Sequence, residues 1–241
     1  MNSSETDAVR ARYQRRKSTV EINRYSLLNA AVWQGVQERQ RAMLRFFAKL
    51  GWTSFAEKTL VEVGCGEGGN LLEFLRLGFR PEHLIGIELL EDRAEKANQV
   101  LPSGIVRLGD ASCAAVPPDS QDVVFQSVVF SSLLDDAFQN DLAARMWSWV
   151  RPGGGVLWYD FTYDNPRNPD VRGVKVKRIR ELFPQGEMTV KRVTLAPPIS
   201  RRACRIHPGL YAVLNAIPLL RTHVLCWIQK APGAGRNGGN G

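Results

Sequence analysis

Residues 60–70, which read Leu-Val-Glu-Val-Gly-Cys-Gly-Glu-Gly-Gly-Asn, join an apolar strand pattern to a cluster of glycines. The β-branched and aliphatic residues at the start of this stretch are typical of a buried parallel strand. Gly64, Gly66 and Gly68 then allow a sharp turn that brings bare backbone close to a ligand. The apolar segment 71–75 predicts a helix, so the turn lies at a helix N-terminus. The pattern indicates a nucleoside-binding turn.

Three acidic side chains could supply further contacts to such a nucleoside. Glu88 ends a second apolar strand about twenty residues past the glycines, where a carboxylate can accept both ribose hydroxyls. Glu62 precedes the glycine turn and can face a cationic amino-acid group. Asp110, in the turn Gly109-Asp110-Ala111, can accept a hydrogen bond from an adenine amino group.

The glycines alone leave two nucleoside cofactors open. Gly64, Gly66 and Gly69 also satisfy G-x-G-x-x-G, the fingerprint of dinucleotide-binding proteins. However, NAD lacks the net cation that Glu62 would face. An NAD-linked oxidoreductase would also be expected to carry a Tyr-x-x-x-Lys pair or a histidine near a late strand, and the sequence places neither there.

Five segments of the chain, in order, resemble the motifs of class I S-adenosylmethionine-dependent methyltransferases. They are E-V-G-C-G-E-G at 62–68, I-E-L-L at 87–90, G-D-A at 109–111, D-V-V-F at 122–125 and R-P-G-G-G at 151–155. The resemblance covers roughly residues 55–165, and the last strands extend it to about residue 230. Five motifs in this order and spacing are far more specific than the glycine pattern alone.

The resemblance implies S-adenosylmethionine as the cofactor. The positions expected to bind it are Glu62, Gly64, Cys65, Gly66, Gly68, Asn70, Glu88, Leu89, Arg93, Gly109, Asp110, Ala111, Gln126 and Ser127. No metal is expected, because the four cysteines are scattered and form neither a C-x-x-C motif nor a Cys/His cluster. Cys65 is interpreted as a small residue that fits a tight turn.

The alternation of strands and helices from residue 59 predicts a Rossmann-like α/β fold. We expect a doubly wound, seven-stranded sheet that is mostly parallel, with helices on both faces. The resemblance implies a reversed C-terminal strand, for which residues 222–229 are the candidate. The segment 188–195 also predicts a strand, with no regular helical pattern immediately after it. The apolar segment 208–220 predicts a packed helix, and contact with lipid is the alternative.

The sequence suggests three parts. Residues 1–54 are expected to form an N-terminal helical extension that covers the cofactor, helical over 25–50 and poorly ordered near its start. Arg12 and Tyr13 in this extension could touch ligand, or could serve only packing. Residues 55–230 are expected to form the methyltransferase domain, with 166–221 as a basic substrate-region insertion. Residues 231–241 are expected to be a disordered tail.

The net charge of +8 is concentrated in one segment. Residues 167–205 hold eleven Lys/Arg and three Asp/Glu, a local charge of +8, whereas residues 1–166 hold eighteen against twenty-one, or −3. Such a basic block attracts polyanions, phosphorylated substrates or anionic lipid. With no signal peptide evident, we expect a cytoplasmic protein, with contact at the inner membrane as a possibility.

The residues after the fourth and fifth strands should carry the chemistry, because ligands bind beyond the carboxyl ends of parallel strands. Asp160 is the candidate general base, with bonding to loop amides as the alternative role. The candidates for acceptor binding are Phe130, Ser131, Tyr163, Arg167 and Arg172. The Asn/Asp-Pro-Pro-Tyr/Phe motif of base and glutamine methylation is absent.

These features favour O-methylation of a small molecule or of a sugar or glycan hydroxyl. The loop after the fifth strand is similar to that of bacterial methyltransferases with such acceptors. The acceptor could be anionic. The alternative is an RNA or protein methyltransferase that uses the basic segment, although nucleic acid is not expected because the segment lacks interleaved aromatics. A cofactor-binding module without catalysis would share the same motifs. The sequence does not predict an oligomeric state.

Overall fold

The computed structural model describes residues 3–17, 26–166 and 168–233. Its helices are α1 (Ser3–Lys17), α2 (Ala30–Lys49), α3 (Gly69–Leu77), α4 (Glu91–Val100), α5 (Asp136–Trp149), α6 (Val176–Leu182), α7 (Pro197–Ile206) and α8 (Leu210–Asn215). Its strands are β1 (Leu60–Val63), β2 (Leu84–Glu88), β3 (Val106–Leu108), β4 (Gln121–Ser127), β5 (Val150–Phe161), β6 (Glu187–Leu195) and β7 (Arg221–Gln229). Short 3-10 turns are η1 (Pro81–His83), η2 (Ala111–Cys113), η3 (Phe130–Ser132) and η4 (Pro218–Leu220).

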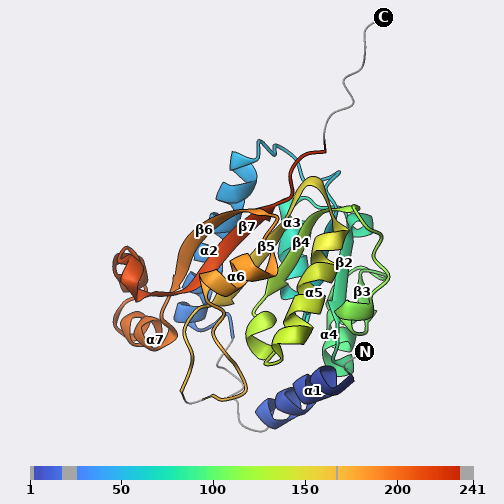
Figure 1. The fold of residues 1–241 in the computed structure, drawn as a ribbon. Coiled ribbons are helices and arrows are strands. Elements are labelled where there is room, and N and C mark those ends of the chain that lie inside the picture. The colour runs from blue at the N-terminus through green and yellow to red at the C-terminus, as the bar shows by residue number, and fades with distance from the viewer. Residues whose placement is uncertain (1–2, 18–25, 167, 234–241) are drawn as a thin grey trace, which may run out of the picture.

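The seven strands form a single sheet in the order β3-β2-β1-β4-β5-β7-β6 (Figure 1). Strands β1 to β5 pair in parallel, whereas β7 runs antiparallel to both β5 and β6. This confirms the predicted seven-stranded α/β fold with a reversed final strand. Because β6 is antiparallel to β7, it ends at the same edge of the sheet as β1 to β5.

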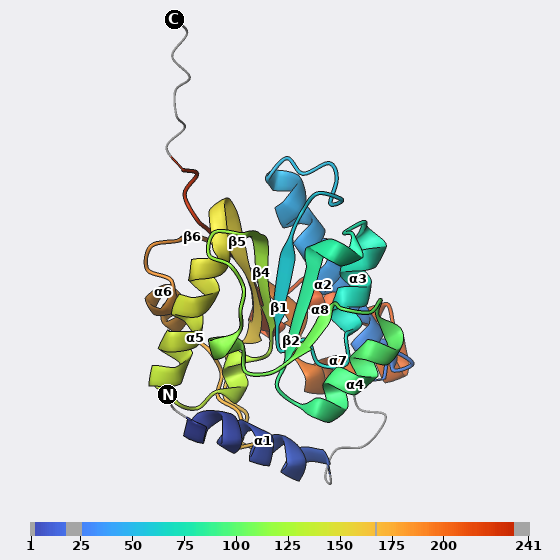
Figure 2. The same ribbon diagram turned by 90° about the vertical axis from the view of Figure 1, so that its right-hand side faces the viewer.

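Helices cover both faces of the sheet (Figures 1 and 2). On one face, α2, α3 and α4 pack through residues such as Phe47 and Phe74, both fully buried. On the other face, α5 and α6 pack against the sheet through Trp149, Ile179 and their neighbours. Burial on both faces explains why the central strands are almost continuously apolar.

Helix α1 lies across the edge where the parallel strands end (Figure 2). The structure therefore corrects the expectation that the first residues are poorly ordered, since residues 3–17 form a helix with buried polar contacts. Helix α2 begins at Ala30, where the side chain of Asn29 caps it by accepting from the N–H of Ala31 at 3.0 Å. The predicted helical start at residue 25 falls outside the described residues.

The largest differences from the prediction lie between residues 195 and 221. Helix α7 begins at two prolines, Pro197 and Pro198, which lack an N–H but fit the first turn of a helix. The predicted single helix over 208–220 is instead the six-residue α8 followed by η4. The segment 166–221 also supplies α6 and the edge strand β6 to the common fold.

Two further findings concern the described residues as a whole. No helix among them has the length and apolar character needed to cross a membrane. No group of three or more His, Cys, Asp or Glu side chains in this part of the chain could hold a metal ion. The predicted disordered tail at 231–241 falls mostly outside the described residues.

Candidate active site

The glycine turn between β1 and α3 leaves an opening at Gly66. Gly64, Gly66 and Gly68 have φ values of +66°, +57° and +85°, a region that side chains other than glycine rarely adopt. A Cβ at Gly64 would lie 2.6 Å from Val129, and one at Gly68 would lie 2.7 Å from Leu101. A Cβ at Gly66 would meet no protein atom within 4 Å. Gly66 is therefore where a ligand can approach the backbone.

Glu62 lies fully buried behind this turn with half of its carboxylate unpaired. Its Oε1 accepts a hydrogen bond from Asn70 Nδ2 at 2.6 Å, while its Oε2 has no hydrogen-bond partner. Burial raises the pKa of Glu62 to about 8, although Asn70 and the nearby Arg39 oppose the rise. A buried acceptor without a donor is costly. The site therefore fits a ligand that brings a cationic donor, such as an α-ammonium group.

Arg39 of α2 connects the glycine turn to the far side of the site. Its guanidinium donates to Asn70 Oδ1 at 2.6 Å and to Ser127 Oγ at 3.2 Å, and it lies 5.1 Å from the centre of the Tyr159 ring. The Tyr159 ring stacks on His223, with centroids 5.1 Å apart. Burial, helped by Arg39, lowers the pKa of His223 to about 4, so its imidazole is neutral at pH 7.

The other acidic residues of the predicted pocket organise its backbone. Glu88 ends β2, and its two carboxylate oxygens accept from the N–H of Gly66 at 2.7 Å and of Leu90 at 2.9 Å. These bonds fix the glycine turn to the start of α4. Asp110 accepts from the N–H of Ser112 at 2.8 Å and caps η2. Both carboxylates stand at the strand ends where the sequence places them.

The remaining cofactor candidates surround the same edge with different exposure. Gln126 is fully buried, donates to the carbonyl of Tyr159 at 3.3 Å and accepts from the N–H of Val129 at 3.0 Å. Leu89 and Ala111 are half-buried and pack against the core, and the N–H of Gly109 donates to the Glu88 carbonyl at 2.8 Å. Cys65 is buried beneath the turn, and burial raises the pKa of its thiol far above its usual value. This agrees with a packing role for Cys65.

The predicted base and two predicted acceptor contacts lie inside the protein. Asp160 has no exposed surface, and its carboxylate accepts from the N–H groups of Ser131 at 3.1 Å and Phe161 at 2.9 Å. Burial raises the pKa of Asp160 to about 7, opposed by these bonds. Phe130 packs 4.5 Å from Trp158, and Ser131 is fully buried. Asp160 thus anchors the loop, Phe130 and Ser131 pack inside the protein, and their predicted catalytic and acceptor roles stay predictions.

The predicted basic contacts also differ from expectation. The Arg172 side chain forms an ion pair with Asp136 at the start of α5. The backbone N–H of Arg172 donates to the Ser131 carbonyl at 2.8 Å. It therefore ties the loop to α5. Tyr163 is 52% exposed and accepts from Arg192 Nη1 at 3.3 Å, so it remains available to a ligand. Arg167 lies outside the described residues.

Helix α1 is held over the site by hydrogen bonds of two buried charged residues, which also pair with each other within the helix. Arg12 Nη2 lies 2.6 Å from Glu5 Oε1 and donates to the Ser132 carbonyl at 3.0 Å. Glu5 also accepts from the backbone of the loop before α5. Tyr13 contacts Arg93 of α4 through a cation–π interaction at 4.5 Å. Arg12 thus serves packing, whereas Tyr13 and Arg93 link the cover to the cofactor side of the site.

Sequence reasoning missed Arg39, Tyr159 and His223. Arg39 lies in a predicted helix but in no motif, and its direction depends on how α2 packs against the sheet. His223 faces the site because the reversed strand β7 begins at the active edge, opposite Phe161. Tyr159 directly precedes Asp160, which was selected from the sequence at the end of the fifth strand. The pairing of β7 with β5 would have shown that His223 faces the site, but the sequence alone does not give that pairing.

Comparison with known proteins gives a consistent result. Residues 60–154 match the family model described as a methyltransferase domain. A SAM-dependent methyltransferase from Archaeoglobus fulgidus superposes with a TM-score of 0.56 at 15% identity, over 79% of this chain and 93% of that one. Phosphoethanolamine N-methyltransferase 1 of Haemonchus contortus superposes with a TM-score of 0.60 at 14% identity, over 100% of this chain and 52% of that one.

A third solved structure, geranyl diphosphate C-methyltransferase from Streptomyces coelicolor A3(2), gives a TM-score of 0.56 at 13% identity, over 78% of this chain and 77% of that one. No curated protein matches the sequence. The three structures named here methylate different atoms or carry no named acceptor, so their likeness concerns the fold. Residues 60–154 match the methyltransferase-domain model, and the chain has the fold of the class I S-adenosylmethionine-dependent methyltransferases.

Proposed function

We propose that this protein transfers a methyl group from S-adenosylmethionine to a hydroxyl oxygen of a small molecule or sugar. The observation that carries the proposal is the unpaired, fully buried Oε2 of Glu62 behind the opening at Gly66. An α-ammonium group would supply the missing donor there. S-adenosylmethionine is the cofactor of this family, and when bound it supplies an electrophilic methyl group.

The residues around the opening carry groups that suit the parts of the cofactor. Gly66 leaves room for close approach to the backbone, and Glu88 and Asp110 stand at the ends of successive strands. Glu62 and Asn70 form the polar floor on the amino-acid side. Arg39 places a positive charge beside these two residues, where its guanidinium donates to the Asn70 amide oxygen.

An oxygen acceptor is supported by the groups on the far side of Arg39. Ser127 and His223 offer a hydroxyl and a neutral imidazole, which can hydrogen-bond an uncharged acceptor, whereas the Tyr159 hydroxyl is bound to Thr194. An amine acceptor would favour exposed carboxylates, yet Asp160, the acidic residue at this position, is enclosed by the loop. The neutral His223 is suited to accept a hydrogen bond from an acceptor hydroxyl and to orient it.

Helix α1 supports the reaction by excluding water. Displacement at a methyl group depends on alignment and on a dry site more than on acid–base chemistry. The bonds of Arg12 to the Ser132 carbonyl and of the Leu134 N–H to Glu5 fix α1 over the edge of the sheet, and Tyr13 with Arg93 closes the cofactor side. RNA or protein methylation has less support, since Arg172 and Arg178 of the basic segment are bound to α5.

The proposal is tested by incubating the full chain with methyl-labelled S-adenosylmethionine and pools of sugars, phenols and other hydroxylated small molecules. We expect labelled methyl ethers that mass spectrometry can identify. The matched control is Glu62→Gln, which keeps the shape of the side chain but removes its charge, and should reduce labelling. Labelling of RNA, of protein or of amine nitrogen in place of hydroxyl oxygen would overturn the acceptor class.

A further inference from the structure

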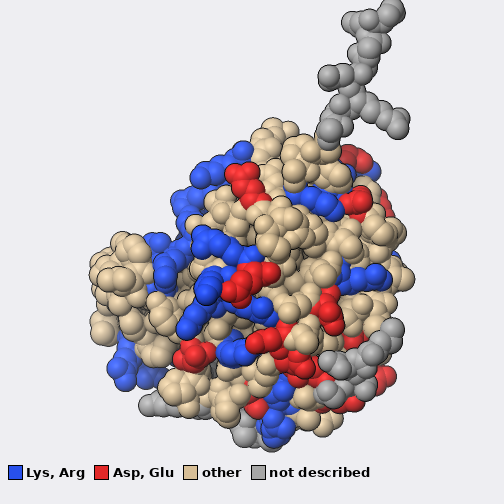
Figure 3. Space-filling model, in the orientation of Figure 1, with Lys and Arg blue, Asp and Glu red and all other residues tan. Residues whose placement is uncertain are grey.

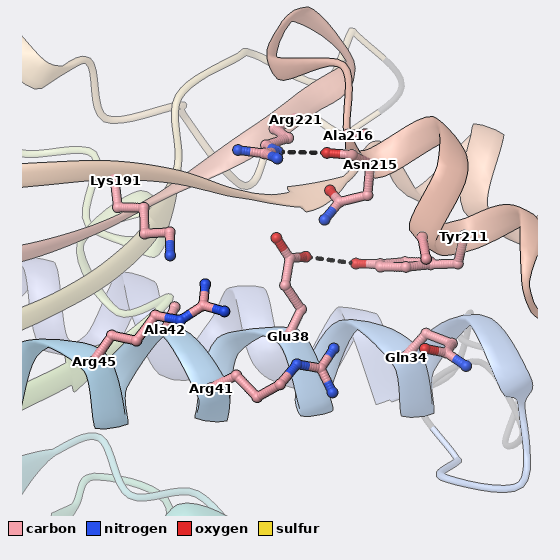
Figure 4. Close-up of a pocket in the computed structure, with 11 residues that line it drawn as sticks. Gln34, Glu38, Arg41, Ala42, Arg45, Lys191, Tyr211, Asn215, Ala216 and Arg221 are labelled. Carbon is pink, nitrogen blue, oxygen red and sulfur yellow. Dashed lines mark hydrogen bonds between the residues drawn. The ribbon is translucent and has the colours of Figure 1, made fainter.

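A second pocket lies on the other side of α2, between this helix, β6 and α8 (Figure 4). Its volume is about 220 Å³, below the roughly 300–1,000 Å³ of sites for drug-sized ligands, so it suits a small polar group. Four cationic side chains line it, namely Arg41, Arg45, Lys191 and Arg221. One carboxylate, Glu38, stands among them, which leaves a formal charge of +3 from four cations and one anion.

Three of the cations lack a carboxylate partner. Arg41, Arg45 and Lys191 form no ion pair within 4.0 Å with any described residue. The pKa of Lys191 is lowered, first by partial burial and then by Arg45 and Arg221. Like charges gathered in a cavity destabilise one another. An anionic ligand would relieve this repulsion.

The fourth cation and the carboxylate are fixed in place by the protein. Arg221 Nε donates to the Asn215 carbonyl at 2.8 Å, and its Nη1 donates to the Arg192 carbonyl at 3.1 Å. Glu38 Oε2 accepts from the Thr194 N–H and from the Tyr211 hydroxyl, both at 2.9 Å. In Figure 4 the Glu38 carboxylate lies at the centre, with Lys191 and Arg45 directed toward it from one side.

Acceptor atoms complete the lining. Asn215 Oδ1 is buried without a hydrogen-bond partner, and Glu38 retains acceptor capacity toward the cavity. The dianion of a phosphate monoester has no donor for either acceptor, so a matching phosphate ester must also carry hydroxyl groups. Thr194 adds an indication that this is a built site, because it holds φ at +63°, a strained value for a β-branched residue.

From these observations we infer that the pocket between α2, β6 and α8 binds the phosphate ester of a hydroxylated molecule. The four cations would hold the phosphate, and Glu38 and Asn215 would accept from hydroxyl groups. The site is separate from the cofactor pocket, so the inference does not depend on the methyl acceptor. Glycerol phosphate has this chemistry, both as a soluble metabolite and as the headgroup of an anionic phospholipid.

The surroundings of the pocket make the lipid source worth testing. Val213, Ile217 and Leu219, next to Asn215 in sequence, are 64%, 46% and 88% exposed. The part of the surface formed by α8 and η4 is uncharged, whereas α7 beside it carries Arg201, Arg202 and Arg205 (Figure 3). Exposed apolar groups beside cations suit the surface of an anionic membrane.

The first experiment is calorimetric titration of the full chain with glycerol 3-phosphate at low ionic strength. We expect saturable binding that weakens at least about tenfold in the double variant Arg45→Gln/Lys191→Gln. Tenfold corresponds to about 1.4 kcal/mol, a modest loss for two charge-assisted contacts. Arg76→Gln, which removes an exposed arginine on α3, is the matched control and should bind like wild type. Thermal unfolding of each variant verifies that the fold is intact.

A second variant tests the sign of the electrostatics independently. Glu38→Gln keeps an oxygen that can accept from Thr194 and Tyr211 but removes a negative charge from the cavity, so it should tighten binding of inorganic phosphate. Glycerol 3-phosphate should gain less, because it loses the acceptor for its hydroxyl group. Co-sedimentation with phosphatidylglycerol vesicles, but not with phosphatidylcholine vesicles, identifies lipid as the source if the double variant abolishes it. Binding of glycerol 3-phosphate without co-sedimentation identifies a soluble ligand. Absence of both, or binding unchanged in the double variant, would overturn the inference.

Discussion

At the scale of single residues, the stability of the protein depends on the protonation state of Glu62. Its pKa of about 8 lies above the ordinary 4.5, so the folded protein retains a proton that the unfolded chain has released. Stability from this group is therefore fully present below pH 4.5 and is lost as the pH rises toward 8. Cofactor binding should act in the opposite direction, because an ammonium group favours the ionised carboxylate.

We predict that Glu62→Gln raises the thermal midpoint of the ligand-free protein at pH 8 and leaves it nearly unchanged at pH 4.5. The reason is that the variant has no charge to bury. The same change should weaken S-adenosylmethionine binding and remove the increase in affinity expected between pH 5.5 and 7.5. Unfolding scans and calorimetry at several pH values measure both effects. If the variant bound cofactor as tightly as wild type, Glu62 would not face the ligand.

Gly66 allows a comparison among glycines that share a left-handed backbone. An alanine at Gly66, Gly64 or Gly78 incurs a similar conformational cost, of about 1 kcal/mol. Only at Gly64 would the new Cβ also collide with a protein atom, at 2.6 Å, so Gly64→Ala should destabilise the most. Gly66→Ala and Gly78→Ala should unfold at similar temperatures, but only Gly66→Ala should lose cofactor affinity. Equal affinity in these two variants would contradict a ligand at Gly66.

The residue-scale prediction from sequence succeeded where backbone geometry determines the role. Gly64 and Gly66 adopt the left-handed conformation that a strand-to-helix turn demands, and Glu88 ends β2 as expected. The roles predicted for Asp160 and Phe130 stay predictions, because residues near a strand end can point into the core or into the site and both side chains are buried. Alternation along a strand does not reveal which of the two faces is covered by a neighbouring loop.

At the scale of elements, α1 depends on a polar attachment rather than on an apolar face. The sequence of this helix is mostly polar, and few of its residues, such as Val9, are buried and apolar. Its order comes from Arg12, Glu5 and the loop before α5, contacts more than a hundred residues apart in sequence. Local pattern therefore predicted disorder where long-range hydrogen bonds produce a helix.

We predict that Arg12→Ala releases α1 from the sheet edge. The change leaves Glu5 as a buried charge without its partner, a penalty of about 3–5 kcal/mol that detachment of the helix avoids. Hydrogen–deuterium exchange should rise over residues 3–17 and 131–134, with little change in β1 to β5. Arg10→Ala, which removes an exposed arginine of the same helix, is the control. Unchanged exchange in Arg12→Ala would show that α1 is held by other contacts.

Helix α6 is attached to α5 by one arginine of the basic segment. Arg178 donates to Gln139 Oε1 at 3.1 Å, to the Asp136 carbonyl at 3.0 Å and to Asn140 Oδ1 at 3.0 Å. We predict that Arg178→Ala destabilises the protein by about 1–2 kcal/mol, or roughly 2–8 °C in the thermal midpoint. Lys177→Ala, at a 90% exposed neighbour, should have almost no effect. Equal midpoints for the two variants would contradict this structural role.

At the scale of the whole molecule, the basic segment seen in the sequence supplies only part of the positive cluster at the second pocket. Residues 167–205 are strongly basic, yet Arg172 and Arg178 are matched by acceptors on α5. Lys191 of this segment, on β6, meets Arg41 and Arg45 of α2, which lie about 150 residues earlier in the chain. A sum over sequence windows cannot detect a cluster assembled by strand pairing and helix packing.

Helix α2 lines both the cofactor site and the second pocket. Arg39 points to the cofactor side, where it donates to Asn70 and Ser127, and the preceding residue, Glu38, bonds to Thr194 and Tyr211 on the opposite side. A shift of α2 cannot improve one set of bonds without disturbing the other. The two pockets should therefore be thermodynamically linked, and linkage is reciprocal. Whatever factor glycerol 3-phosphate imposes on the dissociation constant of S-adenosylmethionine, the cofactor must impose on glycerol 3-phosphate in return.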